Sequence, residues 1–460
     1  MKFNCCGPCL FLLQASAPPF RLIKRRMSAN VAWPQGKGLS GTPGENPVID
    51  TIIGRVARKQ FARAVNFRGG GSPALPPARA GTPCLLYIHV PFCEKLCPYC
   101  SFNRVIFDRD LCREYFGALR KELSLYRERG FSFEGLYAGG GTPTVMIDEL
   151  AATLGHAKSL YPIREISVET NPNHLTDGHL EVLKKAGVNR LSVGIQSFDD
   201  TLLKAMDRYE KYGCGASIAA RLKEIGGMFD TLNADMIFNF AGQSAESLKA
   251  DIDRLLETGV DQVTYYPLMV SSKTRERVQR ALGPVPEDRE RDFYRVITER
   301  LVPPYRFSSA WCFSRKEAMI DEYVVDYDDY AGLGSGSIGY LHGTCYANTF
   351  DIRGYIDRVN RGEIPLAASK VFSPGDQVRY DFLMKLFGLF LDIPSMRRKH
   401  GRPFDWHFSR LLIPFRIVDA VRYDYRKDWL YLTPRGRYYW VVMMREFFTA
   451  VNNFRDYCRQ

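Results

Sequence analysis

Between residues 84 and 300, short apolar runs alternate with longer segments of helical periodicity, and this pattern restricts the fold more than any other feature. Six runs predict strands: Leu85–Val90, Gly135–Ala138, Glu165–Glu169, Arg190–Gly194, Asn233–Phe238 and Gln262–Leu268. Between the last two, we expect a helix that begins at Ser244 and ends before Gly259. Strict alternation predicts an α/β fold, a partial (β/α)6 TIM-like barrel whose active site lies at the carboxyl ends of its strands.

The regions around this barrel have different compositions. Residues 1–83 are basic and rich in Gly and Pro, which predicts a disordered N-terminal extension and linker, and Met27 is a second candidate start. Residues 84–300 form the predicted core barrel, and 301–375 contain a late glycine-rich loop expected to complete the site. Residues 376–460 predict an α+β winged-helix-like domain with a hairpin of Val421–Tyr425 and Trp429–Thr433 and a closing helix, Trp440–Phe454. We interpret this domain as a substrate lid or packing module rather than a DNA-binding unit.

The charge does not point to a nucleic-acid partner. The net charge is +12, but the basic excess lies at the two ends of the chain and the middle is slightly acidic. Basic ends are usually solvated segments, so we expect no nucleic acid as partner. No run of 18 apolar residues predicts a membrane span, and without a secretory signal we expect a cytoplasmic monomer. Most of the scattered cysteines then read as small core residues: Cys112, Cys214, Cys312 and Cys345.

Three cysteines directly after the first predicted strand have a distinctive spacing. Cys93, Cys97 and Cys100 form a C-x3-C-x2-C motif. Three thiolates hold three irons of a [4Fe–4S] cluster and leave the fourth iron free for the amino and carboxylate groups of S-adenosylmethionine. One electron from the cluster then breaks the C–S bond of the sulfonium and yields a 5′-deoxyadenosyl radical. The alternative is a zinc site completed by Cys84 or His89, although zinc prefers paired C-x2-C arms.

An ordered set of further motifs gives a family resemblance over roughly residues 84–440. The motifs are Tyr87–Cys93 (YIHVPFC), Gly139–Pro143 (GGGTP), Glu169–Pro172 (ETNP), Gly194–Phe198 (GIQSF), Arg208 and Gly332–Gly336 (GLGSG). With these motifs the chain resembles the radical S-adenosylmethionine (SAM) superfamily. More narrowly, it resembles the oxygen-independent coproporphyrinogen III oxidase family, which includes HemN oxidases and HemW-type haem chaperones.

The resemblance implies a set of site residues at separate strand ends. The cluster ligands are Cys93, Cys97 and Cys100, and the cofactor-binding residues are Tyr87, Tyr99, Gly140, Gly141, Thr142, Glu169, Gln196, Arg208, Asp235, Pro267 and Ile338. Glycine allows close backbone approach to a ligand, and the planar fork of an arginine suits a carboxylate. Asp235 lies in an apolar strand, where an unpaired carboxylate would be costly. His89, on the buried first strand, we interpret as a structural histidine rather than a ligand or base.

Two departures from the family pattern leave the reaction open. Decarboxylating oxidases have a further cysteine where this chain has Phe102, and the haem motif of the chaperones is missing from Ser308–Arg315. A third branch uses two SAM molecules, and Gln196, Arg208 and Asp235 match its second-cofactor positions. We therefore favour a radical SAM enzyme with one or two SAM molecules, acting on a tetrapyrrole or another large planar substrate. It would be a coproporphyrinogen III oxidase-like oxidoreductase or a two-SAM methyltransferase, with a flavodoxin or ferredoxin as electron donor. The alternative is a HemW-type haem carrier without turnover.

Overall fold

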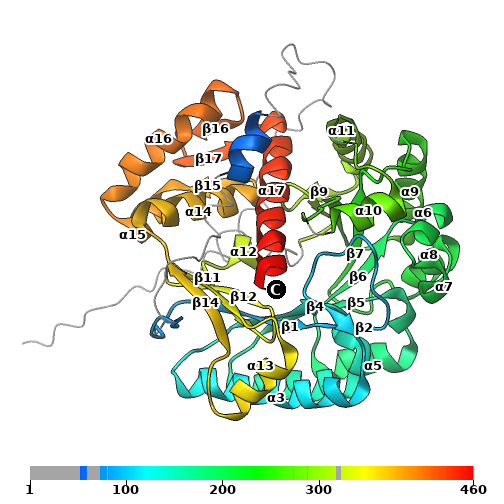
Figure 1. The fold of residues 1–460 in the computed structure, drawn as a ribbon. Helices are drawn as coiled ribbons and strands as arrows, with labels where there is room; N and C mark the ends of the chain where they lie inside the picture. Colours follow the sequence, from blue (N-terminus) through cyan, green and yellow to red (C-terminus); the bar gives the residue numbers. More distant parts are fainter. Residues whose placement is uncertain are drawn as a thin grey trace, which may run out of the picture. The chain divides into compact units, whose positions relative to one another are not determined.

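The computed structural model describes residues 52–59, 73–79, 81–272, 274–286, 288–317 and 323–458. Its main element is a 12-stranded sheet in the order β14-β13-β12-β11-β1-β4-β5-β6-β7-β8-β10-β9 (Figure 1). Most of the predicted N-terminal extension lies outside the described residues. Within it, residues 52–59 form a helix beside the C-terminal helix, where Arg58 Nε donates to Glu446 Oε2 at 2.7 Å.

The six predicted strands are confirmed, with bounds that shift by two residues or fewer. They are β1 (Cys84–Val90), β4 (Gly135–Gly140), β5 (Glu165–Thr170), β6 (Arg190–Gln196), β7 (Thr231–Phe238) and β8 (Gln262–Pro267). Each lies parallel to its neighbour, so the carboxyl ends of all six meet at one edge. β2 (Phe92–Cys93) and β3 (Val105–Ile106) form a small parallel pair around the cysteine loop.

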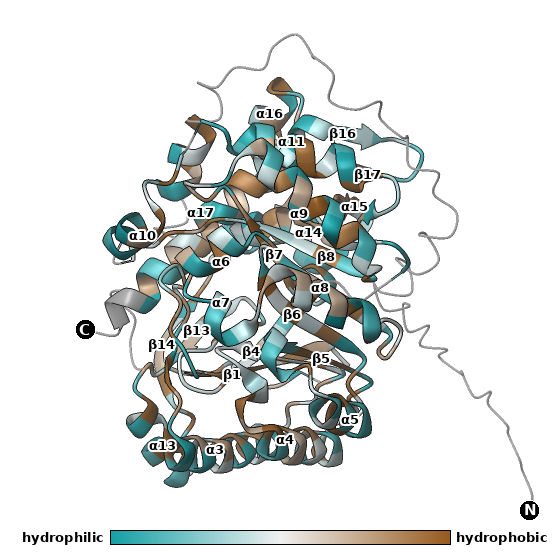
Figure 2. Cartoon of the chain, turned by 90° about the vertical axis from the view of Figure 1, so that its right-hand side faces the viewer, coloured by the Kyte–Doolittle hydropathy of each residue, from teal (hydrophilic) through white to brown (hydrophobic). Residues whose placement is uncertain are grey.

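Helices connect these strands, as the alternation predicts. They are α3 (Arg109–Glu128), α4 (Ile147–Leu160), α5 (Asp177–Ala186), α6 (Asp200–Ala205), α7 (Tyr209–Tyr212), α8 (Gly215–Glu224), α9 (Ala245–Thr258), α10 (Arg275–Leu282) and α11 (Glu290–Leu301), with short 3-10 turns η1 (Pro143–Met146) and η2 (Pro172–His174). The expected ends of α9 are confirmed, because the Ser244 side chain accepts from Ser247 N and Gly259 adopts a φ of 72°. Helices such as α5 and α13 contain many hydrophilic residues, which are teal in Figure 2.

The sheet is larger than the sequence predicts, because segments after residue 300 extend both of its edges. β11 (Asp329–Leu333) pairs parallel with β1, and β12 (Ile338–Leu341), β13 (Thr344–Asn348) and β14 (Leu366–Val371) follow antiparallel. β10 (Cys312–Ser314) and β9 (Arg306–Phe307) extend the other edge beyond β8. The helices α12 (Tyr323–Asp326) and α13 (Ile352–Asn360) belong to the same region. No described pairing joins β14 to β9, so the sheet is an open one.

The C-terminal region has the predicted winged-helix-like order of helices, hairpin and closing helix. It comprises α14 (Pro374–Phe387), β15 (Phe390–Asp392), α15 (Ile393–His400), α16 (Pro403–Ile417), β16 (Val421–Asp424), β17 (Trp429–Leu432) and α17 (Pro434–Cys458). The three strands form an antiparallel sheet in the order β15-β17-β16. α17 begins six residues before the predicted Trp440 and continues past Phe454. None of the helices in the described ranges is long and apolar enough to cross a membrane.

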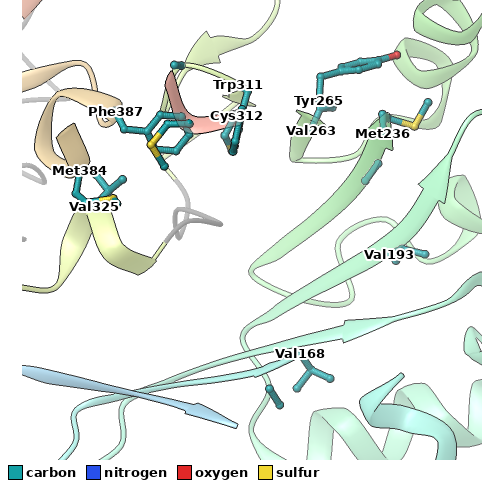
Figure 3. Packing of buried hydrophobic residues seen from close by; sticks show 14 of the residues in the cluster. Val168, Val193, Met236, Val263, Tyr265, Trp311, Cys312, Val325, Met384 and Phe387 are labelled. Carbon is teal, nitrogen blue, oxygen red and sulfur yellow. The ribbon is translucent and has the colours of Figure 1, made fainter. Parts of the chain in front are cut away.

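The hydrophobic core runs from the parallel strands into the C-terminal region. Val168, Val193 and Val263 are fully buried on β5, β6 and β8 (Figure 3). Trp311, next to β10, packs edge-on against Phe387 of α14 at 4.8 Å between ring centroids. This shared core fixes the C-terminal helices near the carboxyl ends of the strands.

Candidate active site

A cavity of about 790 Å³ lies at the carboxyl ends of the parallel strands. The site residues implied by the sequence line it with one exception: Tyr87, Cys93, Cys97, Tyr99, Cys100, Gly140, Gly141, Glu169, Gln196, Arg208, Asp235, Pro267 and Ile338. The exception is Thr142, whose hydroxyl lies 3.8 Å from the Cys93 sulfur and accepts from Asn171 Nδ2 at 2.9 Å. The fold therefore brings together residues that are up to 251 positions apart in the sequence, from Tyr87 to Ile338.

The three cysteines share one loop at this cavity, and none is in a disulfide. Arg104 holds the loop from inside, because its Nη2 donates to the carbonyl oxygens of Cys97 and Cys100 at 2.6 and 2.9 Å. Arg277 donates to Pro98 O at 2.7 Å from the other side. Burial raises the pKa of the Cys93 thiol to about 12, and the nearby Cys100 adds to this effect while Arg104 opposes it. Binding of a cationic iron centre to the Cys93 sulfur would therefore release a proton.

The arrangement fits a cluster better than a single metal ion. Among the described residues, no three His, Cys, Asp or Glu side chains converge closely enough to hold one ion, which disfavours the zinc alternative. In a cubane cluster each cysteine binds a different iron, so the sulfurs lie further apart. Two buried guanidinium groups flank the loop, and Nε of both Arg104 and Arg208 has no hydrogen-bond partner in the described structure. Such donors suit an anionic cluster or a carboxylate ligand.

Arg208 connects the cluster loop to the end of β6. Its Nη1 lies 3.6 Å from the Cys97 sulfur, and its Nη2 donates to Asn171 Oδ1 at 3.1 Å and to the carbonyl oxygen of Gly194. The Tyr212 ring packs 4.2 Å from the guanidinium. Burial favours the neutral form of Arg208, but the nearby Tyr99 and Cys97 outweigh it and raise its pKa. The side chain is thus a fixed positive charge beside the cysteines.

Gln196 ends β6 in a strained conformation. Its φ is 76°, in the left-handed region that non-glycine residues rarely adopt, and the β6–β7 register shifts between Gly194 and Gln196. Such an outlier at a cavity wall indicates a side chain held in position by its surroundings. The bulge aims Gln196 into the cavity, in agreement with its place among the lining residues.

Glu169 at the end of β5 is held by the glycine loop after β4. Its Oε2 accepts from Gly140 N at 3.0 Å and its Oε1 accepts from the Tyr137 hydroxyl at 2.8 Å. A Cβ atom on Gly139 would lie 2.6 Å from Glu169 Oε1. Gly139 is therefore needed for the approach of this carboxylate as well as for any ligand.

Asp235 and His89, two further polar residues of the strands, have protein partners. Asp235 accepts from the Ser192 hydroxyl at 2.8 Å and from Asn233 Nδ2 at 2.7 Å, which accounts for a carboxylate on an apolar strand. His89 is fully buried, with Nδ1 2.8 Å from the Tyr87 hydroxyl and Nε2 2.8 Å from the carbonyl oxygen of Asn103. Because that carbonyl only accepts, Nε2 carries the proton and Tyr87 donates to Nδ1. This network fits the structural role expected for His89.

Two further walls of the cavity are not marked by any sequence motif. One is an aromatic wall from β4, α12, β11 and α14: Tyr137, Tyr323, Tyr330 and Tyr380. The other is the C-terminal end of α17, from Phe447 to Arg455. With 25 tyrosines and 29 phenylalanines scattered along the chain, no spacing marks these residues before the fold is known.

Fold and site together define a protein of the radical SAM class, and comparisons with known proteins agree. A sequence model of the Radical SAM superfamily matches residues 87–255. The heme chaperone HemW of Mycobacterium tuberculosis is 30% identical over 79% of this chain and 94% of its own length. An anaerobic coproporphyrinogen III oxidase of Cereibacter sphaeroides is 28% identical over 78% of this chain and 86% of its own length. The coproporphyrinogen III oxidase HemN of Escherichia coli superposes with a TM-score of 0.66 at 23% identity, covering 84% of this chain and 93% of that one.

The chain belongs to the radical SAM superfamily and, within it, to the family of HemW heme chaperones and oxygen-independent coproporphyrinogen III oxidases. Membership implies a [4Fe–4S] cluster and S-adenosylmethionine as cofactors.

Proposed function

We propose that this protein is a radical SAM enzyme that holds its cluster on Cys93, Cys97 and Cys100 and acts on a tetrapyrrole or another large planar substrate. The observation that carries the proposal is the convergence of these cysteines with Glu169, Arg208 and an aromatic wall on one cavity. A cavity of about 790 Å³ is at the upper end of the range for small-molecule sites, so it has room for a cofactor and for part of a substrate.

Different residues of the cavity would bind different parts of the cofactors. Cys93, Cys97 and Cys100 would hold the cluster, which would supply the electron for reductive cleavage of SAM. Arg208 is a fixed cation for the carboxylate of a methionine moiety, and Glu169 accepts from a ribose hydroxyl or an amino group. Gly140 and Gly141 present backbone next to the cysteine loop, and the Tyr99 ring offers a face for adenine. In a reaction with two SAM molecules, Gln196, Arg208 and Asp235 would meet the second one.

The substrate reaction has two candidate forms within the enzyme class. An oxidase-like reaction would release carbon dioxide from coproporphyrinogen, and a two-SAM methyl transfer would release S-adenosylhomocysteine. The test is anaerobic reconstitution of the cluster with a chemical reductant or flavodoxin, followed by measurement of these products and of 5′-deoxyadenosine. Absence of 5′-deoxyadenosine under all conditions would contradict the enzyme proposal.

A second candidate is a heme carrier that uses the cluster without turnover. Two observations favour it: Phe102 stands where the oxidases have a further cysteine, and relatives named heme chaperone match most of the chain. A carrier would give a stable heme absorption spectrum and no product derived from heme or SAM. The product assay above separates the two candidates.

A further inference from the structure

The C-terminal end of α17 forms one side of the cavity. Figure 1 shows this end of the helix directed toward the parallel strands. Six of its residues line the cavity: Phe447, Phe448, Val451, Asn452, Phe454 and Arg455. The lining therefore includes a segment that begins 180 residues after the end of β8 at Pro267.

Contacts on several sides hold this end of the helix. Asn453 Oδ1 accepts from the backbone N–H of Ser272, in the loop after β8, at 2.9 Å. The Phe454 ring lies edge-on to Phe350, after β13, at 6.2 Å between centroids. The Arg455 guanidinium lies 5.1 Å from the centre of the Phe102 ring, in the segment that follows the third cysteine. The helix end is thus fixed to the segments that follow β8 and β13 and to the cysteine loop.

Arg455 brings a buried positive charge to this place. Its exposed fraction is 7%, and its Nη1 donates to Asn452 Oδ1 at 2.9 Å. Its charge acts on two tyrosines of the cavity: burial raises the pKa of both Tyr87 and Tyr330, and Arg455 opposes the rise at each. Arg455 therefore lies near Tyr87 and near Tyr330 of the aromatic wall, as well as near the cysteine loop.

The surrounding wall is aromatic. Tyr87 stacks on Tyr323 with centroids 5.6 Å apart and planes at 25°. The three acidic residues that line the cavity have protein partners: Asp376 lies 2.7 Å from Arg379, Glu169 accepts from Gly140 N and the Tyr137 hydroxyl, and Asp235 accepts from Ser192 and Asn233. A planar ligand on the tyrosines would present its edge to Arg455, and a guanidinium recognises a carboxylate there by a charge-assisted fork.

We propose that Arg455 on α17 is a substrate-binding residue that receives a carboxylate at the edge of the planar substrate, next to Phe102 and the tyrosine wall. This inference rests on the proposed function and assigns one residue of α17 to the edge of its substrate. Arg455 packs against Phe102. Phe102 occupies the position where the decarboxylating oxidases have a further cysteine, so Arg455 contacts the residue that distinguishes this chain from those oxidases.

The test compares two probes on the full chain with its cluster reconstituted anaerobically. Coproporphyrin III carries four carboxylates, and its tetramethyl ester has the same ring with the carboxylates masked. We expect Arg455→Gln to weaken binding of the free acid about tenfold or more, the usual value of a charge-assisted pair, and to change ester binding by less than about twofold. Arg455→Lys should restore part of the lost affinity, because it keeps the charge without the fork.

Arg410→Gln is the matched control, because it removes the same charge from α16, where Arg410 packs on the exposed Trp406. It should leave the affinities for both probes unchanged. Equal loss of both probes in Arg455→Gln, with reduced helicity, would mean a structural role and would overturn the proposal, as would unchanged binding of the free acid. Failure of the wild-type protein to bind either probe would instead overturn the proposed function, and this inference with it. Tight binding of the ester by the wild type, equal to that of the acid, would overturn the carboxylate inference alone.

Discussion

At the scale of single residues, two buried arginines hold the site through backbone oxygens, the Asn171 side chain and a cysteine sulfur. Arg104 donates to the carbonyl oxygens of the cysteine loop, and Arg208 reaches both the Cys97 sulfur and the carbonyl oxygen of Gly194. Neither guanidinium shares an ion pair with a carboxylate among the described contacts. The positive charge of the two side chains is therefore directed at the cysteines and at the cavity.

Cys97→Ala is predicted to abolish the cluster and all turnover while leaving the sheet folded. Two thiolates cannot hold three irons, and Cys97 lies on the loop at the cavity, outside the strands of the sheet. Iron and sulfide analysis after anaerobic reconstitution measures the loss, and far-ultraviolet circular dichroism checks the fold. Cys112→Ala, on the outer helix α3, is the control and should retain full iron content.

Arg208→Gln is predicted to weaken SAM binding while the cluster remains. Loss of a charge-assisted fork to a carboxylate typically costs about 1.5–3 kcal/mol, so we expect roughly 10- to 100-fold weaker binding. The KM for SAM in the 5′-deoxyadenosine assay measures this change. Unchanged KM together with normal iron content would exclude Arg208 from the cofactor site.

At the scale of elements, the strand ends are predictable from sequence and the close approaches between loops are not. The alternation of apolar runs and helical segments located six strands within two residues, because each strand is buried on both faces. The glycine motif at the end of β4 indicates a ligand-binding loop, but it does not predict how that loop packs against the cysteine loop. A Cβ atom on Gly141 would lie 2.6 Å from Phe92 O and 3.0 Å from the Cys93 sulfur. These atoms belong to residues far from Gly141 in the sequence, so no local sequence pattern reveals the contacts.

Gly141→Ala is predicted to displace the cysteine loop and to destabilise the protein by about 1–3 kcal/mol, the usual cost of overpacking. Reconstituted iron content and chemical denaturation measure the two effects. Gly155→Ala is the matched control, because Gly155 lies inside α4 with no atom within 4 Å of its would-be Cβ. It should be neutral or more stable by about 0.5–1 kcal/mol.

Glu122 links α3 to the late glycine-rich loop and is predicted to make stability depend on pH. It is fully buried and accepts from Gly334 N, Asn348 Nδ2 and the Tyr355 hydroxyl at 2.8, 2.9 and 2.6 Å. Burial outweighs these donors and raises its pKa from 4.5 to about 7. The folded state therefore binds more protons than the unfolded state between these values, so stability falls as the pH rises from about 4.5 to 7 and levels off above.

The measurement is the free energy of unfolding by urea between pH 5 and 8, for the wild type and Glu122→Gln. The variant should lack this component, whose slope is at most about 1.4 kcal/mol per pH unit. Parallel curves for the two proteins would show that Glu122 does not titrate in this range.

At the scale of the whole molecule, segments from after residue 300 complete both the sheet and the cavity. β11 pairs Tyr87 with Gly332, so the late glycine-rich loop lies beside the first strand, and the sheet gains strands that the sequence pattern does not show. β11 contains only five residues, two of them Gly332 and Ala331, which is too weak a pattern to predict a buried parallel strand. The resemblance placed Ile338 at the site, whereas the tyrosine wall and Arg455 depend on tertiary packing alone.

The central claim is that the three cysteines leave one iron of the cluster free for S-adenosylmethionine. Electron paramagnetic resonance of the reduced, anaerobically reconstituted protein, recorded with and without SAM, tests it directly. We predict a [4Fe–4S] signal that changes when SAM is added and is lost in Cys97→Ala. A mononuclear zinc centre, or a cluster signal that SAM leaves unchanged, would contradict the account.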